Sequence, residues 1–507
     1  MMYLDALQNG SDIRGIALDY QDKKANLTPK QLEKIAIGIV RWLENDVLAS
    51  KCKRNQLKIG IGHDSRITAD SLKQTLIDTF LHLGIQVIDF QLATTPAMFM
   101  ATQFSQYNCD ATIMITASHL PYYFNGLKIF TKKEGAEKKD IQYILTHHES
   151  LPGVKGGTIL TTSLLDDYAD DLIHKIKVGI HTQNEKPLAG YKIIVDAGNG
   201  AGGFFVEKVL KPLGANTEGS QFLDPDGMFP NHIPNPDNEE AMHSIQAAVL
   251  KQQADLGIIF DTDVDRSAIV DANGQVINRN NLIALLATIV LEGNPKSAIV
   301  TNSPTSSHLK EFIESKGGKQ IRYISGYRNV INKMIELNNQ GIQTELAIET
   351  SGHAAFKENY CLDDGAYVVA KLLMLLPKLA ANHQTLGGLI ATLKQPAEVH
   401  ELRFQIKAND VQTYGNQIIS DLEVFIQQQK DMVIDPENEE GIRTNVFNQY
   451  GNGWFLLRMS LHEPLLVLQI ENDKQTKNRH VLKTLEPFFQ QFYQLDDKAL
   501  KNYLHQK

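Results

Sequence analysis

Segments typical of strands and helices alternate through most of this chain, and that alternation constrains its fold more than any other feature. Residues 57–61 are apolar at strand spacing, residues 71–83 carry apolar side chains at helical spacing, and residues 85–90 return to a strand pattern after Gly84. Repeated strand–helix–strand patterns predict parallel α/β layers, in which helices cover sheets. Later segments repeat the pattern: helix 164–176 and strands 191–196, 255–260, 298–300, 321–324 and 346–348.

The 507 residues exceed what one hydrophobic core supports, so three or four domains are expected. Three units each end in an apolar strand followed by a polar loop. Beyond residue 395, strand-like 402–404, helix-like 411–428 and strand-like 454–458 suggest a smaller α+β domain. The sequence predicts three related mixed α/β domains and a smaller C-terminal domain, with the ranges 1–155, 156–271, 272–395 and 396–507.

The first polar loop reads Thr-Ala-Ser-His-Leu-Pro over residues 116–121 and follows the apolar run 111–115. A small-residue turn at a strand end holds the hydroxyl of Ser118 at the edge of a sheet, where loops commonly carry chemistry. His119 and Lys128 lie close in sequence and can position phosphate or move protons. Alone, each of these residues also fits an ordinary turn or a solvated surface.

The second polar loop places Asp261, Asp263 and Asp265 at alternate positions after the strand 255–260. Three carboxylates this close repel each other, so the loop either raises their pKa values or holds a cation, and hard oxygens suit Mg²⁺. Beside the serine loop, this pattern suggests a phosphoserine that works with a divalent cation. A strand-capping turn and an aspartate-nucleophile phosphotransferase are the alternatives.

Two further loops have weaker signals. Glu349, Ser351 and His353 offer groups suited to sugar hydroxyls, and Arg458 with Ser460 is suited to gripping a phosphate. Each also reads as a capped or solvated loop. The glycine-rich stretch 198–203 lacks the Lys-Ser/Thr of a P-loop and is interpreted as a close strand–helix turn.

The bulk composition narrows the partners. Fifty Lys and Arg against 59 Asp and Glu give a net charge of −9, which argues against a nucleic-acid partner. Three separated cysteines fit a reducing compartment, no signal-peptide pattern opens the chain, and the longest apolar run, 282–291, is too short to cross a membrane. We expect a cytoplasmic protein without a membrane partner; the oligomeric state is left open.

Taken together and in order, these loops resemble the α-D-phosphohexomutase superfamily through nearly the whole chain. The most specific matches are T-A-S-H-x-P at 116–121 and D-x-D-x-D-R at 261–266. Residues 12–15 match the N-terminal arginine–glycine motif, 62–66 the following phosphate-side loop, 349–353 the sugar loop, and 458–464 the C-terminal phosphate loop.

The resemblance implies four domains around a central cleft and a mutase that interconverts hexose 1-phosphate and 6-phosphate, with mannose and/or glucose as the sugar. Ser118 corresponds to the phosphorylated residue, and it holds Mg²⁺ together with the three aspartates. A 1,6-bisphosphate of glucose or mannose is the intermediate and activator. Arg14 and Lys128 match positions near the transferring group. Arg266 follows the metal loop and is assigned to substrate binding, and His353 matches a position for proton transfer or substrate contact.

The chain departs from the common motifs at four positions. Leu120 stands where Asn is common, Thr262 and Val264 replace the common glycines or alanine, and His462 stands where Thr is common. None of these changes removes a phosphate acceptor, a carboxylate or an arginine. A sugar loop that contacts the 3- and 4-hydroxyls need not discriminate at C2, which favours a dual phosphomannomutase/phosphoglucomutase. The alternatives are a phosphoglucosamine mutase, a non-catalytic sugar-phosphate-binding member, a metal-dependent phosphatase and, lower still, a phosphopentomutase-like enzyme.

Overall fold

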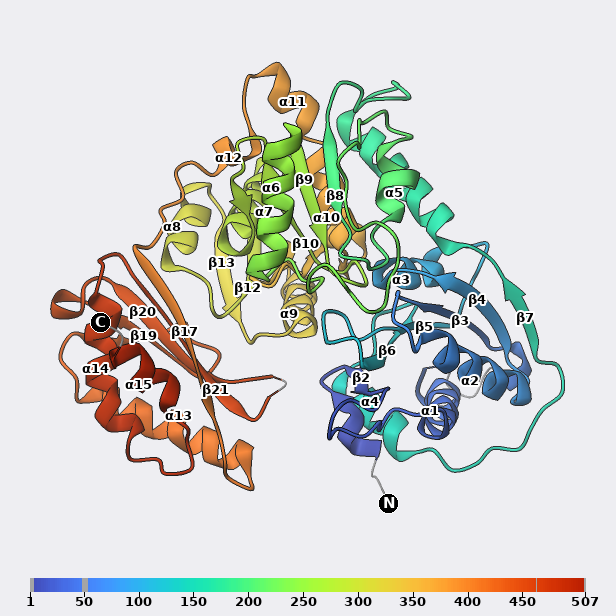
Figure 1. Ribbon diagram of the computed structural model, residues 1–507, viewed down its shortest axis with the longest axis horizontal. Helices are drawn as coiled ribbons and strands as arrows, with labels where there is room; N and C mark the ends of the chain where they lie inside the picture. Colours follow the sequence, from blue (N-terminus) through green and yellow to red (C-terminus); the bar gives the residue numbers. More distant parts are fainter. Residues whose placement is uncertain (1–3, 48–52, 462, 506–507) are drawn as a thin grey trace. The chain divides into compact units, whose positions relative to one another are not determined.

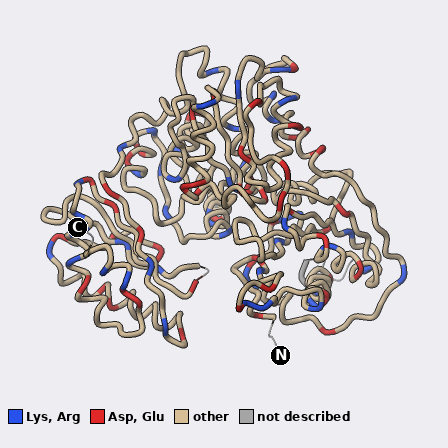
Figure 2. Tube along the Cα trace, in the orientation of Figure 1, with Lys and Arg blue, Asp and Glu red and all other residues tan. Residues whose placement is uncertain are grey.

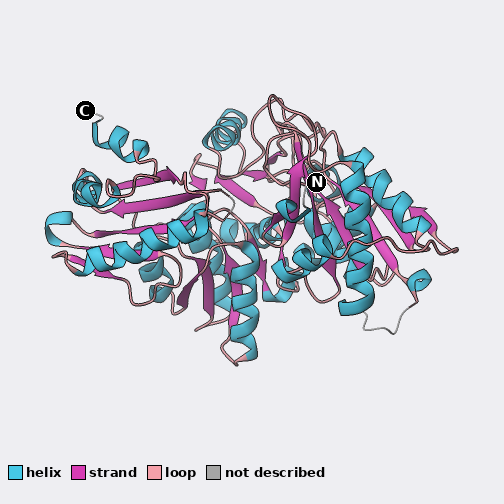
Figure 3. Cartoon of the chain, turned by 90° about the horizontal axis from the view of Figure 1, so that it is seen from below, coloured by secondary structure: helices cyan, strands magenta, loops and turns pink. Residues whose placement is uncertain are grey.

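The computed structural model describes residues 4–47, 53–461 and 463–505 (Figure 1). The chain divides into two compact units. The first unit contains the chain up to Asn278 together with Ser351–Ala355 and Leu362–Gly388. The second unit contains Arg279–Thr350, Phe356–Cys361 and the chain from Leu389. Helices and strands alternate in both units (Figure 3), and basic and acidic residues are interspersed along the trace (Figure 2).

The first unit opens with a seven-stranded mixed sheet in the order β1-β2-β6-β5-β3-β4-β7. Strands β3, β4, β5 and β7 run parallel to one another, whereas β6 is antiparallel to β5 and to β2. The central strand β5 is buried at every residue, as its apolar β-branched sequence predicts. The strands are β1 (Gln8–Asn9), β2 (Asp12–Ile16), β3 (Lys58–His63), β4 (Gln86–Leu92), β5 (Ala111–Ile115), β6 (Phe124–Thr131) and β7 (Thr158–Thr161).

Four helices accompany this sheet: α1 (Pro29–Trp42), α2 (Ala69–His82), α3 (Thr95–Gln103) and α4 (Lys138–Thr146). Helix α1 packs against α2 and α4, and its buried leucine and isoleucine residues join the sheet in one core. Proline at the first position of α1 suits a helix start because the missing N–H has no helical acceptor there.

A second sheet of the first unit has the order β11-β10-β9-β8, with β8 parallel to β9 and β10 antiparallel to both neighbours. Its strands are β8 (Ile193–Asp196), β9 (Leu256–Phe260), β10 (Ser267–Asp271) and β11 (Val276–Ile277). Helix α6 (Glu239–Gln252) packs on β9 and β10, and α5 (Leu164–Ile180) packs on α10 (Gly365–Leu373). A short π-helix, η4 (Val206–Leu210), follows the glycine-rich turn after β8.

The second unit contains three parallel strands in the order β13-β12-β14. They are β12 (Ala298–Asn302), β13 (Lys319–Tyr323) and β14 (Thr344–Ile348), and their helices are α7 (Arg279–Gly293), α8 (Ser307–Ser315) and α9 (Tyr327–Asn339). Further along the chain, β16 (Leu362–Asp363) and α11 (Leu376–Ala381) belong to the first unit, whereas β15 (Ala354–Phe356) and α12 (Leu386–Leu389) each have residues in both units.

The C-terminal part of the second unit is a five-stranded antiparallel sheet in the order β17-β21-β20-β19-β18. Its strands are β17 (Glu398–Gln405), β18 (Met432–Ile434), β19 (Ile442–Val446), β20 (Gly453–Met459) and β21 (Leu465–Asn472). Helices α13 (Val411–Gln427), α14 (Lys477–Phe489) and α15 (Lys498–His505) contribute to its core. This is the α+β arrangement that the sequence predicted for the last part of the chain.

The expected α/β class is confirmed, with sheets that are mixed rather than purely parallel. Strands β3, β4, β9, β14 and β20 fall within a few residues of their predicted places. The four predicted domain ranges remain predictions; β7, just after residue 155, pairs with β4. No helix among the described residues is long and apolar enough to cross a membrane.

Candidate active site

The loop after β5 holds Ser118 in a left-handed backbone conformation, with φ of 50°. Only a few per cent of non-glycine residues adopt positive φ, and such residues cluster at functional sites. The backbone N–H of Ser118 donates to Thr116 Oγ1 at 2.9 Å, and Thr116 Oγ1 donates to the carboxylate of Asp64 at 2.6 Å. The side chain of Ser118 is buried and aimed by its own loop.

Arg66 holds the other side of this loop. Its guanidinium donates to the carbonyl oxygens of Ser118 (2.5 Å), Leu120 (2.6 Å), Pro121 (2.9 Å) and Phe124 (3.0 Å). Arg66 Nε also lies 3.3 Å from Asp64 Oδ2, and both side chains are fully buried. The motif at 62–66, matched above to a phosphate-side loop, thus acts here on the backbone of the serine loop.

The hydroxyl of Ser118 meets the second polar loop. Ser118 Oγ donates to Asp261 Oδ2 at 3.0 Å and accepts from Arg266 Nη2 at 2.6 Å. Arg266 also donates to Asp261 Oδ2 through Nε (3.0 Å) and Nη2 (2.8 Å). Arg14 approaches the same loop, because its Nη1 donates to the carbonyl of Ala117 at 3.3 Å. The structure therefore brings the predicted nucleophile to the predicted metal loop.

The aspartate loop follows β9 and is locally strained, since Val264 has a φ of 66°. A β-branched residue rarely adopts this conformation, which glycine adopts freely, so the strain lies at a position where the common motif has a smaller residue. Gly200 lies close to the loop, and a Cβ there would come 2.6 Å from the carbonyl of Thr262. The glycine-rich stretch after β8 is thus a close turn, as predicted.

The carboxylates of Asp261, Asp263 and Asp265 are completely buried and offer oxygens within 4.8 Å of one another. Lys128, on β6, pairs with Asp265 and lies 3.4 Å from Asp263 Oδ2. The Oδ1 atoms of Asp263 and Asp265 have no hydrogen-bond partner in the described part of the chain. Three carboxylates opposed by Lys128 and Arg266, with two oxygens that accept no hydrogen bond from the described residues, fit a hard divalent cation such as Mg²⁺.

The surrounding charges separate these carboxylates. Burial, followed by the negative charge of Asp265, raises the pKa of Asp261 well above its usual value. Burial also acts to raise the pKa of Asp265, but Lys128, His353 and Arg266 outweigh it and hold that pKa well below its usual range. Neighbouring carboxyl groups whose pKa values are shifted in opposite directions are typical of functional sites.

Two histidines adjoin the hydroxyl and the carboxylates. His119 Nδ1 lies 2.7 Å from Arg266 Nη2 and 3.4 Å from Ser118 Oγ, and burial with the Arg266 charge lowers its pKa well below the usual value. His353 Nδ1 donates to Asp363 at 2.5 Å. Burial alone would lower the pKa of His353, but Asp363 and Asp265 outweigh it and raise that pKa to about 9. At neutral pH the site therefore holds one neutral and one charged imidazole.

The remaining predicted residues lie further along the chain. In the first unit, Ser351 Oγ is buried without a hydrogen-bond partner among the described residues. In the second unit, Glu349 Oε1 accepts from the backbone N–H of Gly326 at 2.7 Å. Arg458 is the penultimate residue of β20 and donates to the carbonyl of Met459 at 3.1 Å. The backbone N–H of Ser460 donates to the carbonyl of Leu465 at 2.9 Å. His462 lies outside the described residues.

Three polar residues at the site have no counterpart in the sequence prediction. Thr95 Oγ1 donates to Asp263 Oδ2 at 2.5 Å, Asn235 Oδ1 accepts from Arg266 Nη1 at 3.3 Å, and Asp363 binds His353. Each stands in a short polar segment at a strand or helix end, but so do many surface residues. Only the folded chain distinguishes them.

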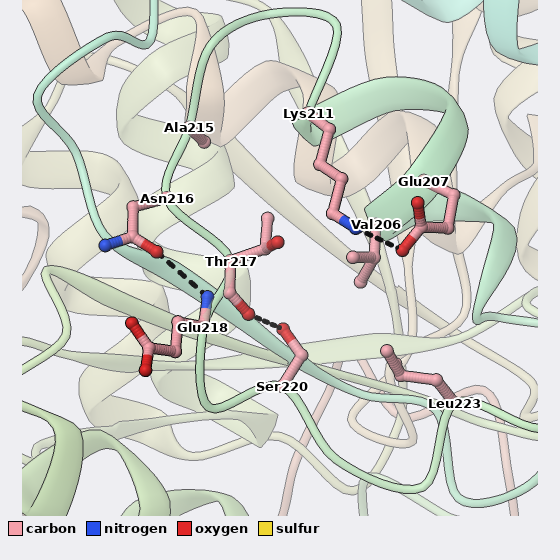
Figure 4. Close-up of a pocket in the computed structure, with 9 residues that line it drawn as sticks. All are labelled: Val206, Glu207, Lys211, Ala215, Asn216, Thr217, Glu218, Ser220 and Leu223. Carbon is pink, nitrogen blue, oxygen red and sulfur yellow. Dashed lines mark hydrogen bonds and ion pairs between the residues drawn. The ribbon is translucent and has the colours of Figure 1, made fainter.

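A separate shallow pocket of about 470 Å³ lies between η4 and the loop 215–223 (Figure 4). Two of its charged residues, Lys211 and Glu207, form an ion pair with each other. The hydroxyl of Ser220 donates a hydrogen bond to the carbonyl oxygen of Thr217. Its lining contains none of the predicted site residues. This pocket therefore lies apart from the meeting of the serine and aspartate loops.

Comparison with known proteins agrees with this geometry. Sequence models of the phosphoglucomutase/phosphomannomutase family match three consecutive parts of the chain: alpha/beta/alpha domain I at residues 5–151, domain II at 166–274 and domain III at 278–395. The phosphomannomutase/phosphoglucomutase of Pseudomonas syringae pv. tomato is 31% identical over 447 residues, covering 86% of this chain and 88% of the relative. That of Pseudomonas putida is 29% identical and covers 87% and 89%.

A solved phosphoglucomutase/phosphomannomutase family protein from Burkholderia thailandensis superposes with a TM-score of 0.76 at 25% identity, covering 99% of this chain and 98% of that one. The similarity thus extends over all four sheets and over both loops that meet at Ser118. The chain therefore belongs to the phosphoglucomutase/phosphomannomutase family of the α-D-phosphohexomutase superfamily.

Proposed function

We propose that this chain is a phosphohexomutase that interconverts hexose 1-phosphate and hexose 6-phosphate, with mannose and glucose as its sugars, through a phosphorylated Ser118. The observation that carries the proposal is the hydroxyl of Ser118, held between Asp261 (3.0 Å) and Arg266 (2.6 Å) beside a buried cluster of three carboxylates. A buried serine so placed is suited to carrying a phosphoryl group next to a cation.

Phosphoryl transfer from Ser118 to the sugar balances without an external reactant. A sugar hydroxyl oxygen bonds to phosphorus as the bond from phosphorus to Ser118 Oγ breaks, and the proton lost by the sugar is matched by one gained at Oγ. The resulting 1,6-bisphosphate returns its other phosphoryl group to Ser118 by the reverse step. Glucose 1,6-bisphosphate or mannose 1,6-bisphosphate then serves as activator, because it phosphorylates resting Ser118.

The side chains around Ser118 have distinct roles in this scheme. Arg266 Nη2 stabilises the negative charge that develops on Oγ as the phosphoryl group leaves. His353, whose pKa is raised to about 9, is a proton donor at neutral pH, and neutral His119 can accept one. Lys128 lies at the carboxylates, and Arg14 lies at the backbone of Ala117. Their positive charges favour a dianionic phosphoryl group on Ser118.

Mg²⁺ would be held by Asp261, Asp263 and Asp265 together with the phosphorylated Ser118. When bound, it offsets phosphoryl charge and polarises the phosphoryl oxygens. The sugar hydroxyls are assigned to Glu349 and Ser351, and the distal phosphate to Arg458 and Ser460, as the resemblance implies. The cytoplasmic location remains a prediction from the sequence.

The test is a coupled mutase assay with Mg²⁺ and a trace of glucose 1,6-bisphosphate, in which mannose, glucose and glucosamine 1-phosphates are compared by kcat/KM. Intact-mass measurement after incubation with the bisphosphate reports one added phosphoryl group. Ser118→Ala should lose turnover and labelling, whereas Ser71→Ala, an exposed serine on α2, should retain both.

The outcomes separate the candidate functions. Comparable mannose and glucose rates support the dual mutase, and a strong glucosamine preference supports a phosphoglucosamine mutase instead. Absent turnover with sugar phosphate still bound supports a non-catalytic binding protein. Steady phosphate release that needs no bisphosphate indicates a phosphatase.

A further inference from the structure

Residues 224–235, the arginine-contacting loop, touch both arginines that hold the serine loop and its hydroxyl. The ring centre of Phe229 lies 5.3 Å from the guanidinium carbon of Arg66, at cation–π distance. At the other end, Asn235 Oδ1 accepts a hydrogen bond from Arg266 Nη1 at 3.3 Å. One loop, far in sequence from Ser118, thus contacts the guanidinium groups on both sides of it.

The arginine-contacting loop is itself anchored to the end of β8. His232 is buried, and its Nε2 lies 3.0 Å from both carboxylate oxygens of Asp196. Asn199 clamps the loop from two directions, since its Nδ2 donates to the carbonyl of Asp224 at 2.9 Å and its Oδ1 accepts from Asn231 at 2.7 Å. A segment without helix or strand is therefore held by buried and partly buried side-chain hydrogen bonds.

The loop also lies directly against the chain at Arg66. A Cβ at Gly227 would come 2.4 Å from the backbone nitrogen of Ile67 and 2.5 Å from the carbonyl of Ser65, a contact that a side chain does not tolerate. The absence of a side chain at Gly227 therefore allows the close approach that brings Phe229 over Arg66.

We propose that the arginine-contacting loop is a positioning element for phosphoryl transfer, in which Asn235 fixes the orientation of Arg266 toward Ser118 while Phe229 covers Arg66. The proposal rests on the proposed function for its kinetic consequence. Asn235 is a positioning residue, because it acts through Arg266 and has no contact with Ser118 itself.

The planarity of the guanidinium explains why a single acceptor matters. The Nε and Nη2 atoms of Arg266 donate to Asp261, and Nη2 also donates to Ser118. The third nitrogen, Nη1, donates to Asn235 Oδ1. If Asn235 is replaced by a residue without an acceptor, Nη1 is left unpaired in a buried site, which favours rotation of the guanidinium toward another acceptor. Because the guanidinium is planar and rigid, the same rotation displaces Nη2 from Ser118 Oγ. Arg266 Nη2 contacts the hydroxyl that carries the phosphoryl group, so the loss should affect kcat more than KM.

The experiment compares Asn235→Leu, Asn235→Asp and Asn238→Ala in the full-length protein. Asn235→Leu removes the acceptor at similar size, and we expect kcat to fall about tenfold to hundredfold with little change in KM. Asn235→Asp keeps an acceptor and should recover most of the rate. Asn238 caps α6 by accepting from Ala241 N–H and makes no contact with Arg266, so Asn238→Ala should lower thermal stability and leave kcat unchanged.

Hydrogen exchange supplies a readout that does not depend on turnover. Phe229→Ala should speed amide exchange in the serine loop, 116–121, relative to wild type, whereas Asn238→Ala should not. Unchanged exchange in Phe229→Ala, unchanged kcat in Asn235→Leu, equal losses in Asn235→Leu and Asn238→Ala, or no recovery in Asn235→Asp would each overturn the proposal. If the wild type shows no mutase turnover, the proposed function fails, and the exchange result still decides whether the loop positions the site.

Discussion

Replacement of Arg66 should expose how strongly the serine loop depends on one buried guanidinium. Arg66 is 2% exposed, donates to four backbone carbonyls of residues 118–124 and pairs with Asp64. Arg66→Met removes all of these donors and leaves the Asp64 carboxylate without its cation. Arg66→Lys keeps a cation but cannot reach four divergent oxygens with one ammonium group.

The magnitude follows from these contacts. Breaking a buried ion pair from one side destabilises a protein by about 3–5 kcal/mol. Each hydrogen bond from a charged donor contributes about 1.5–3 kcal/mol, but bonds that share one side chain do not add. For Arg66→Met we expect a loss of about 3–5 kcal/mol or more, and for Arg66→Lys about 1.5–3 kcal/mol, one lost charged hydrogen bond.

Urea unfolding followed by tryptophan fluorescence measures the effect. Trp42 is buried in α1 of the same unit as Arg66 and reports on it, and Trp454 is buried in β20 of the second unit. A protein of several domains need not unfold in one step, so the two probes are followed separately in single-tryptophan backgrounds. The Trp42 transition should shift to lower urea, and the Trp454 transition should shift less.

The matched control is Arg403→Met, because Arg403 is half-exposed and its ion pairs within the described part of the chain are with exposed glutamates. Surface pairs of this kind contribute little, so its effect should stay within about 0.5 kcal/mol. An Arg66→Met midpoint no lower than that of Arg403→Met would refute the reasoning, since it would mean that the serine loop holds its shape without the guanidinium.

Three further predictions concern the His232–Asp196 pair, the aspartate loop and Gly227. Burial acts to lower the pKa of His232, but Asp196 outweighs it and raises that pKa above the ordinary 6.5. The pair therefore stabilises the fold fully below pH 6.5 and loses its effect as pH rises through the pKa of His232 in the folded state. The difference in Tm between wild type and His232→Gln should shrink above pH 6.5, and a constant difference from pH 5.5 to 9 would contradict this. Mg²⁺ at a hundred times its Kd should stabilise the fold by about 2.7 kcal/mol, seen as a rise in Tm that chelation reverses and that Asp263→Asn largely abolishes; an equal rise in both proteins would place the ion elsewhere. Gly227→Ala should lower Tm and mutase activity together, because its Cβ would meet the backbone of Ile67 at 2.4 Å; Gly190→Ala, which has open space but a φ of 95°, controls for backbone strain alone.

Much of the site could be read from local sequence because its chemistry follows strand ends. Ser118 and the aspartates each come directly after a fully buried apolar strand, β5 and β9, and the periodicity of such strands is visible in the residues themselves. The strain at Val264 could also be anticipated from the sequence, because a β-branched residue stands where the common motif has a smaller one. Asn235, Thr95 and Asp363 could not be found in this way, because an isolated polar residue in a loop has no periodicity to mark it.

The sequence by itself determined the alternation of strands and helices, the residue types at each strand end and the resemblance to a phosphohexomutase. These are local properties, set by side-chain spacing and by turn residues within a few positions. Only the tertiary structure decided which loops meet: Ser118 bonds Asp261 across 143 positions of sequence, and Lys128 reaches Asp265 across 137. Contacts at that separation depend on how the sheets pack, and packing is a property of the whole buried core that no short window of sequence contains.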